Sequence, residues 1–118
     1  MITQHTRNAV KEWDSKTSKT WWAWIYVGGD YHTAEGICRQ GCFPCGLCVT
    51  IEQIQYVFAG GSETGVRIGL IQYPPFEEDE ATLRGKAIRL ARMVAEANHQ
   101  WSYSVVMPGE TEFWSRRA

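Results

Sequence analysis

The stretch that decides the fold is Trp21-Trp22-Ala23-Trp24-Ile25-Tyr26-Val27, which ends at the turn signal Gly28-Gly29-Asp30. Aromatic and β-branched residues at this density are typical of a β-strand, and a glycine pair directly after it predicts a turn. Successive side chains of a strand point to opposite faces of the sheet. Two apolar sets alternate along this strand, namely Trp21, Ala23, Ile25 and Val27 against Trp22, Trp24 and Tyr26. Both faces of the strand therefore need cover.

The next regular segments predict a β-hairpin. Alternating apolar residues run from Leu47 to Ile51, and the alternation then changes phase and continues from Ile54 to Phe58. Such a phase change predicts a bulge, here at Glu52-Gln53. The glycine-rich residues 60–65 predict the turn, and residues 66–73 resume the strand pattern.

One long helix is expected after the hairpin. Pro74-Pro75 ends the strand, and an acidic run then places negative charge at the positive end of a helix dipole. The helix is predicted to run to about His99, with Gly85 marking a close approach to the sheet. Its apolar stripe consists of Leu83, Ala87, Leu90, Val94 and Ala97.

Two further strands are expected, over residues 102–107 and, at a sheet edge, over residues 111–114. The sequence thus predicts an α+β fold, in which a largely antiparallel sheet of four to five strands carries one long helix on one face. We expect residues 1–20 to form a polar N-terminal arm and residues 21–118 to form a single domain.

One helix cannot cover both faces of such a sheet. Because the strand at residues 21–27 is apolar on both sides, something else has to cover the second face. A second copy of the chain, giving a homodimer, is the leading interpretation. The alternative is that the arm and the cysteine-rich segment fold back over that face.

Composition indicates which partners and which cell compartment to expect. The 118 residues have a formal net charge of −1, so no general attraction for nucleic acid is expected. No apolar run is long enough for a signal peptide or a membrane span, which predicts no membrane association and a cytoplasmic protein. In that reducing compartment the four cysteines are expected as thiols or metal ligands.

Three of the four cysteines lie in residues 30–46, a segment that we expect to be a structured loop because it lacks an apolar period. The Cys42-Phe43-Pro44-Cys45 spacing resembles a zinc knuckle, and it also matches a redox pair. Three of the cysteines have the spacing of an iron–sulfur site. The alternative is that the thiols pack as small hydrophobic side chains and that no cofactor is bound. The candidate metal ligands, with zinc as the metal, are Cys38, Cys42, Cys45 and Cys48.

Two other groups are candidates for a site. Asp30, His32 and Glu35 bring carboxylates and an imidazole into one short segment, although no nucleophile motif accompanies them. Clustered aromatic side chains often line a ligand pocket or an interface. The candidate ligand or interface residues are therefore Trp21, Trp22, Trp24, Tyr26, Trp101 and Trp114.

The order of five segments resembles small orphan proteins of phages and integron gene cassettes. These segments are residues 26–30, the cysteine-rich segment, Gly46-Leu47-Cys48-Val49-Thr50, Gly60-Gly61-Ser62-Glu63 and Gly69-Leu70-Ile71-Gln72-Tyr73-Pro74. The similarity covers about residues 21–115. It implies a bacterial mobile element as the source, and it implies no catalytic residue, because such proteins have no assigned activity.

Three functional hypotheses follow. The first is a non-catalytic binding or interaction protein that self-associates through an aromatic sheet face. The second is a small-molecule binding protein or small enzyme, with a pocket formed by residues 30–48 and nearby tryptophans. The third is a module stabilised by zinc through its cysteines. The sequence favours binding over catalysis.

Overall fold

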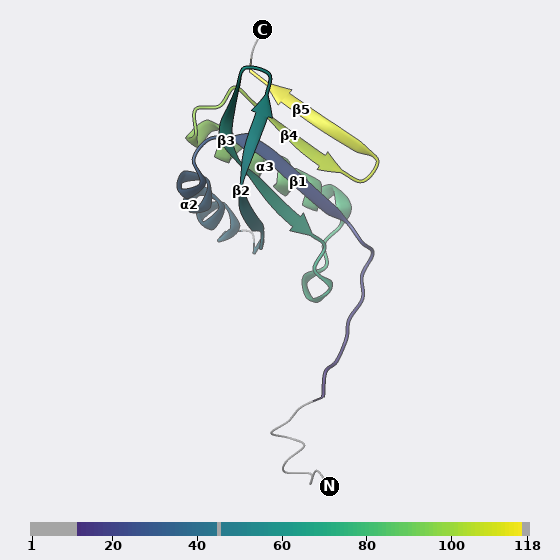
Figure 1. Ribbon diagram of the computed structural model, residues 1–118. Helices are drawn as coiled ribbons and strands as arrows, with labels where there is room; N and C mark the ends of the chain where they lie inside the picture. Colours follow the sequence, from purple (N-terminus) through teal and green to yellow (C-terminus); the bar gives the residue numbers. More distant parts are fainter. Residues whose placement is uncertain (1–11, 45, 117–118) are drawn as a thin grey trace.

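The computed structural model describes residues 12–44 and 46–116 (Figure 1). It contains a five-stranded antiparallel sheet and two α-helices, which confirms the α+β fold class. Along the sheet the strands follow the order β2 (Thr50–Phe58), β3 (Gly61–Ile71), β1 (Trp22–Gly28), β4 (Ser102–Met107) and β5 (Glu110–Ser115). The helices are α2 (Tyr31–Cys42) and α3 (Glu80–Ala97), and a short 3-10 helix, η1 (Pro74–Phe76), lies between β3 and α3.

The central strand β1 has the two apolar faces that its sequence predicts. Ala23, Ile25 and Val27 are buried against the helices, whereas Trp22, Trp24 and Tyr26 are half-buried on the other side. We call that other side, opposite the helices, the open face. The long helix is also confirmed, since Leu83, Ala87, Leu90 and Val94 are all buried. The core therefore lies between β1 and α3.

The expectation of a loop over residues 30–46 was wrong, because residues 31–42 form α2. The Asp30 side chain caps this helix by accepting hydrogen bonds from Thr33 N at 2.9 Å and Thr33 Oγ1 at 3.1 Å. Its buried stripe is Ala34, Cys38 and Gly41, which have the helical spacing but small side chains. This stripe packs against α3, where a Cβ on Gly41 would lie 3.0 Å from Leu90 Cδ1.

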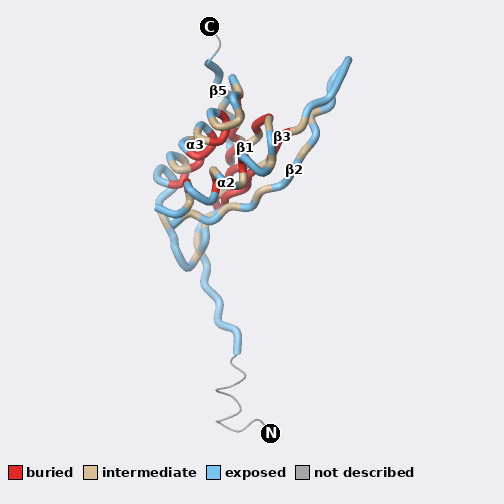
Figure 2. The backbone as a smooth tube through the Cα atoms, turned by 90° about the vertical axis from the view of Figure 1, so that its left-hand side faces the viewer, coloured by how far each residue is buried: buried red, intermediate tan, exposed pale blue. Residues whose placement is uncertain are grey.

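Both helices lie on the same face of the sheet (Figure 2). The second helix therefore adds no cover to the open face. Among the described residues, the segment 12–20 has no regular structure and extends away from the sheet (Figure 1), with Trp13 99% exposed. Neither segment proposed as a cover, so far as the structure describes them, lies over the open face.

The β2–β3 hairpin is confirmed, but its details differ from expectation. No bulge occurs at Glu52-Gln53, because the pairing runs without interruption from Thr50↔Gly69 to Phe58↔Gly61. The phase change arises because the apolar residues change sides, with Ile51 packed on the core and Ile54 and Tyr56 on the open face. The turn is also shorter than expected, at residues 59–60, and residues 61–65 belong to β3.

Gly85 does not mark a close approach to the sheet, contrary to the prediction. It is exposed in α3, and a Cβ added there would have no heavy atom within 4 Å. We therefore expect Gly85→Ala to raise the free energy of unfolding by about 0.5–1 kcal/mol, since alanine restricts the unfolded chain and favours the helix. Urea denaturation measures this gain. Gly41→Ala is the control and should show no such gain, because its Cβ would press on Leu90.

None of the helices in the described ranges, 12–44 and 46–116, combines the length and the apolar character that crossing a membrane requires.

Candidate functional site

A pocket of about 710 Å³ lies at the end of the sheet where β3 leaves it. Four segments form it: the α2–β2 connection, the last residue of β3, the turn around η1 and the start of α3. This volume falls within the range of small-molecule binding sites. The residues that determine its chemistry are Leu47, Cys48, Tyr73, Phe76, Glu77 and Leu83.

The turn at residues 72–78 is the outer wall of the pocket, and its own sequence holds its shape. Pro74-Pro75 ends β3 and begins η1, in which Phe76 N donates to Tyr73 O at 2.9 Å. The Gln72 side chain closes the turn through two hydrogen bonds, from its Nε2 to Glu78 O at 2.6 Å and to its Oε1 from Glu78 N at 2.9 Å. Gln72 N also donates to Trp21 O at 2.8 Å, which fastens the turn to the start of β1.

The start of α3 forms the wall next to this turn. Asp79 caps the helix by accepting from Thr82 N at 2.7 Å, and the hydrogen bonds from Thr82 lower the pKa of Asp79. The Lys86 ammonium forms an ion pair with the Glu78 carboxylate. The two glutamates that line the pocket thus differ, because the Glu78 carboxylate is paired with Lys86 whereas Glu77 is exposed on the turn.

Apolar and aromatic side chains make up most of the pocket wall. Leu83 is buried at its base, and Tyr73 and Phe76 are 37% and 77% exposed at its rim. The hydrogen bond between the side chains of Tyr73 and Cys48 is the main cause of a raised pKa of Tyr73. The electrostatic interaction with the same Cys48 side chain also raises this pKa. Since the ordinary phenol pKa is already near 10, Tyr73 stays protonated at neutral pH. Its hydroxyl therefore remains neutral.

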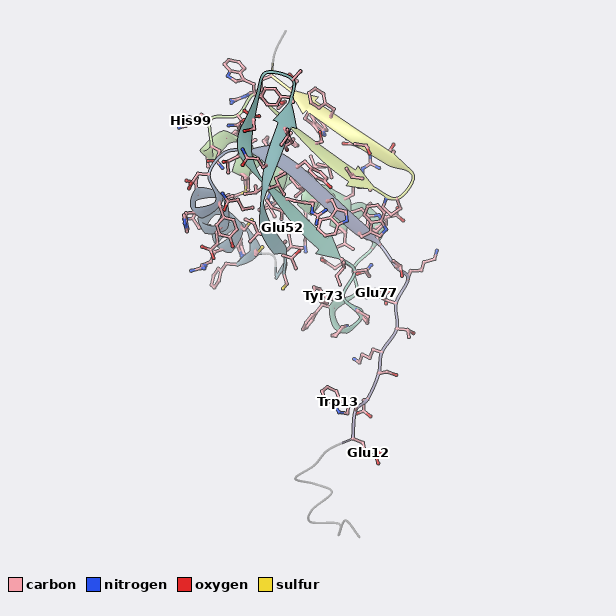
Figure 3. The ribbon with its side chains drawn as sticks, viewed as in Figure 1. Glu12, Trp13, Glu52, Tyr73, Glu77 and His99 are labelled. Carbon is pink, nitrogen blue, oxygen red and sulfur yellow. The ribbon has the colours of Figure 1, made fainter. Side chains whose placement is uncertain are left out.

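Glu77 gives the pocket a negative charge that no described residue neutralises through an ion pair. Within the described residues its carboxylate makes no hydrogen bond or ion pair, and Figure 3 shows it on the same turn as Tyr73. A cation is attracted both by a carboxylate and by the faces of aromatic rings. The arrangement therefore favours a ligand with a flat apolar body and a positive charge.

The six aromatic residues singled out from the sequence lie in three separate places, and none of them lines this pocket. Trp21 is in the core, and Trp22, Trp24 and Tyr26 lie along the open face. Trp101 and Trp114 lie at the other end of the sheet, where a small cavity of about 110 Å³ has Arg116 at its edge. In that cavity the Trp114 ring stacks on Tyr103 at a centroid distance of 6.3 Å.

Among the candidate metal ligands, Cys38 lies in the core, Cys42 is half-buried at the end of α2, and Cys48 lines the pocket. Cys38 is buried, and burial, Cys42 and Glu35 raise its pKa to about 12, so it is protonated at neutral pH. Cys48 is exposed at the pocket, and Cys45 lies outside the described residues. Throughout the part of the chain that is described, no group of three or more His, Cys, Asp or Glu side chains is placed to hold a metal ion. Zinc binding stays a prediction, which metal analysis of untagged protein can test.

Asp30, His32 and Glu35 have structural roles at α2. Asp30 caps the helix, and the hydrogen bond from Thr33 N is the main cause of its lowered pKa. The His32 ring packs edge-on to Tyr31 at a centroid distance of 5.6 Å. Glu35 pairs with Arg39 one helical turn later, at 3.5 Å. These three side chains do not converge on a common point.

The pocket residues on the 72–78 turn were missed from the sequence. Tyr73 and Phe76 flank a proline pair, and Glu77 begins the acidic run that we assigned only to the helix dipole. Aromatic residues flanking Pro74-Pro75 were a signal for an ordered turn with exposed rings. Of the segment 30–48, which was predicted to form a pocket, Gly46, Leu47 and Cys48 line this one, whereas none of the predicted tryptophans does.

A second group of polar and aromatic side chains lies on the open face, where Figure 3 labels Glu52. The Arg67 guanidinium lies 4.3 Å from the centroid of the Trp24 ring, and its Nε donates to Glu52 Oε1 at 2.8 Å. Tyr56 lies near Tyr26 and Glu63, and burial is the main cause of its raised pKa. This surface has aromatic rings and paired charges, but the pocket described above lies beyond it, at the end of β3.

Comparison with solved structures shows what the fold is similar to. The apo form of a phage SAM lyase superimposes with a TM-score of 0.69 at 14% sequence identity, over 91% of this chain and 98% of that chain. A phage SAM lyase in complex with S-methyl-5'-thioadenosine gives a TM-score of 0.63 at 15% identity, over 89% and 96% of the two chains. No family model matches the sequence, and no curated protein matches it. The chain therefore shares the fold of these lyases.

Proposed function

We propose that the chain binds S-adenosylmethionine in the pocket at the end of β3 and cleaves it as a lyase, releasing S-methyl-5'-thioadenosine. The observation that carries the proposal is the pocket itself, in which the rings of Tyr73 and Phe76 lie beside the Glu77 carboxylate. S-Adenosylmethionine has a flat adenine and a positively charged sulfonium, which are the two features that this pocket favours.

The shared fold supports this choice of ligand among cationic aromatic molecules. The similarity to the phage SAM lyase extends over nearly the whole of both chains, at a TM-score of 0.69. The pocket volume of about 710 Å³ is also suitable for a nucleoside with an amino-acid arm. Leu47 and Leu83 provide apolar surface, and the protonated Tyr73 hydroxyl provides a neutral polar group.

The reaction needs no second substrate. The bond between the sulfonium sulfur and the four-carbon amino-acid arm breaks, and its electron pair stays on sulfur, which becomes the neutral thioether of S-methyl-5'-thioadenosine. The carbon that loses sulfur forms a new bond in one of two ways. Either the arm's own carboxylate attacks it and forms a lactone, or the neighbouring carbon loses a proton to solvent water and the C–H electron pair forms an alkene. Mass spectrometry of the four-carbon product distinguishes the two routes.

The sulfonium loses its charge during this reaction, which assigns different roles to the pocket residues. A carboxylate such as Glu77 binds the charged substrate more strongly than the neutral product, so it contributes to substrate binding and not to the bond-breaking step. The rings bind the adenine in substrate and product alike. The Phe76 and Glu77 side chains can therefore be tested separately.

Phe76→Ala tests the contribution of the rings. We expect it to raise the dissociation constants of S-adenosylmethionine and of S-methyl-5'-thioadenosine by about fivefold each, because stacking on one ring is lost. Since Phe76 is 77% exposed, folding should not suffer. Isothermal titration calorimetry measures both constants.

Phe43→Ala is the matched control, because Phe43 is 90% exposed at the end of α2 and does not line the pocket. It should leave both constants unchanged. Equal effects of the two variants, or no binding of either ligand to the unaltered protein, would contradict the proposal. Binding without any release of S-methyl-5'-thioadenosine would leave a binding protein and would refute the lyase activity.

A further inference from the structure

The open face is an aromatic-rich surface that the described part of the chain leaves without cover. Residues directly opposite in an antiparallel sheet share a face, so the register identifies its members. They include Trp22, Trp24 and Tyr26 of β1, Tyr56 and Phe58 of β2, and Phe113 of β5. Both helices lie on the opposite side of the sheet, and residues 12–20 extend away from it (Figures 1 and 2).

The middle of the open face is flat because aromatic rings lie over glycines. A Cβ added to Gly69 would lie 2.7 Å from Trp24 Cζ3, and one added to Gly65 would lie 2.5 Å from Tyr56 Cε2. The Arg67 charge on this surface is already neutralised within the chain, since Arg67 is paired with Glu52 and stacked on Trp24. A partner docking here would therefore not leave that cation buried without a counter-charge.

The β2–β3 hairpin projects from the sheet at one end of the open face. Its tip extends beyond the sheet on the side away from the helices (Figure 2). Phe58, near this tip, belongs to the open face by register and is 54% exposed. One surface thus has both a projecting aromatic arm and a flat aromatic floor, which is the self-complementary shape that a two-fold interface needs.

The exposed area matches what a stable dimer requires. Phe58, Ile71 and Phe113 are 54%, 51% and 69% exposed, which amounts to roughly 300 Å² of apolar surface. The half-buried aromatic residues of β1 and β2 add roughly 200 Å². An apolar area of about 500 Å² corresponds to about 800 Å² for each partner, because interfaces are roughly 60% apolar.

We infer that the open face is the interface with a second copy of this chain, in which the hairpin arm of each copy packs on the sheet of the other. Phe58 and Phe113 are contact residues in this assembly. The inference does not require the proposed lyase activity, and the two surfaces meet at Ile71, which belongs to the open face by register and also lines the pocket.

Sedimentation velocity at about 50 μM protein tests the inference, and the concentration suits the micromolar affinities of such interfaces. We expect the unaltered protein to sediment with at least twice the 13.5 kDa of one chain. Phe58→Glu combined with Phe113→Glu should raise the dissociation constant for self-association at least a hundredfold and give a 13.5 kDa species. Phe43→Glu, on the exposed end of α2, is the control and should leave the mass unchanged.

A monomer for the unaltered protein at this concentration overturns the inference without use of any variant. An assembly that survives the double substitution, or that Phe43→Glu disrupts equally, shows that another surface holds the copies together and overturns it as well. Circular dichroism of the variants confirms that they are folded. Sedimentation is measured without S-adenosylmethionine, so the result does not depend on whether the protein binds this ligand. Failure of the proposed function is recognised from the binding measurements instead.

Discussion

We expect Gly65→Val to lower the free energy of unfolding by about 2–4 kcal/mol, with a fall in melting temperature of about 10 °C. Gly65 is buried in β3, where a Cβ would lie 2.8 Å from the backbone oxygen of Val27 and 2.5 Å from the Tyr56 ring. The backbone oxygen belongs to the central strand and cannot move without disturbing the sheet. Urea denaturation followed by circular dichroism measures the loss.

Gly61→Val is the matched control for this substitution. Gly61 lies on the same strand and, by register, on the same face, but it is exposed and its Cβ would meet only the Phe58 ring, at 3.3 Å. A side chain at the hairpin tip can move away, so we expect a change within about 0.5 kcal/mol. Equal losses at the two positions would show that any side chain on this face is harmful and that the close contact at Gly65 is not the cause.

The second large effect is expected at Glu77. We predict that Glu77→Gln raises the dissociation constant of S-adenosylmethionine about tenfold and leaves that of S-methyl-5'-thioadenosine unchanged. The substitution removes the charge but keeps the size of the side chain, and only the first ligand is a cation. In turnover measurements KM should rise while kcat stays constant or increases, because the sulfonium that Glu77 binds in the ground state loses its charge as the bond breaks.

Glu12→Gln is the control, because it removes an exposed carboxylate from the extended segment far from the pocket (Figure 3). It should leave the affinity for both ligands unchanged, which separates the local effect of Glu77 from the effect of net charge. Should Glu77→Gln weaken both ligands equally, the carboxylate would not face the sulfonium. A fall in kcat at constant KM would instead assign Glu77 to the bond-breaking step.

The strands and the long helix were predictable because large apolar residues mark their periods. In β1 the alternation of Ile25 with Trp24 and Tyr26 is unbroken, and in α3 the stripe from Leu83 to Val94 returns at helical spacing. The same regularity predicted the hairpin and the open face. These features depend on local sequence, so no tertiary information was needed to recognise them.

Helix α2 was missed although its core-facing residues return at helical spacing. Ala34, Cys38 and Gly41 are buried, and Tyr31 and Ile37 are partly buried against the core. The capping interaction of Asp30 with Thr33 was visible in the sequence and indicated a helix start. The three cysteines, Pro44 and the glycines of residues 30–46 favoured a structured loop instead.

The sequence predicted one wall of a pocket, within residues 30–48, but not the other wall, because the two are distant in sequence. Cys48 follows α2, whereas Phe76 and Glu77 precede α3, and only the tertiary fold brings them to one end of the sheet. The individual residues match no motif, and Glu77 had an adequate explanation in the helix dipole. The aromatic residues that stood out in the sequence belong to the core, to the open face and to a second small cavity.

The pocket assignment is tested most directly by a ¹H–¹⁵N correlation spectrum of the protein titrated with S-methyl-5'-thioadenosine. We predict saturable shifts of the backbone amides of Leu47, Cys48, Tyr73, Phe76 and Glu77, with smaller changes elsewhere. Shifts confined to the open face around Trp24 and Arg67, or no saturable shift at millimolar ligand, would contradict the account.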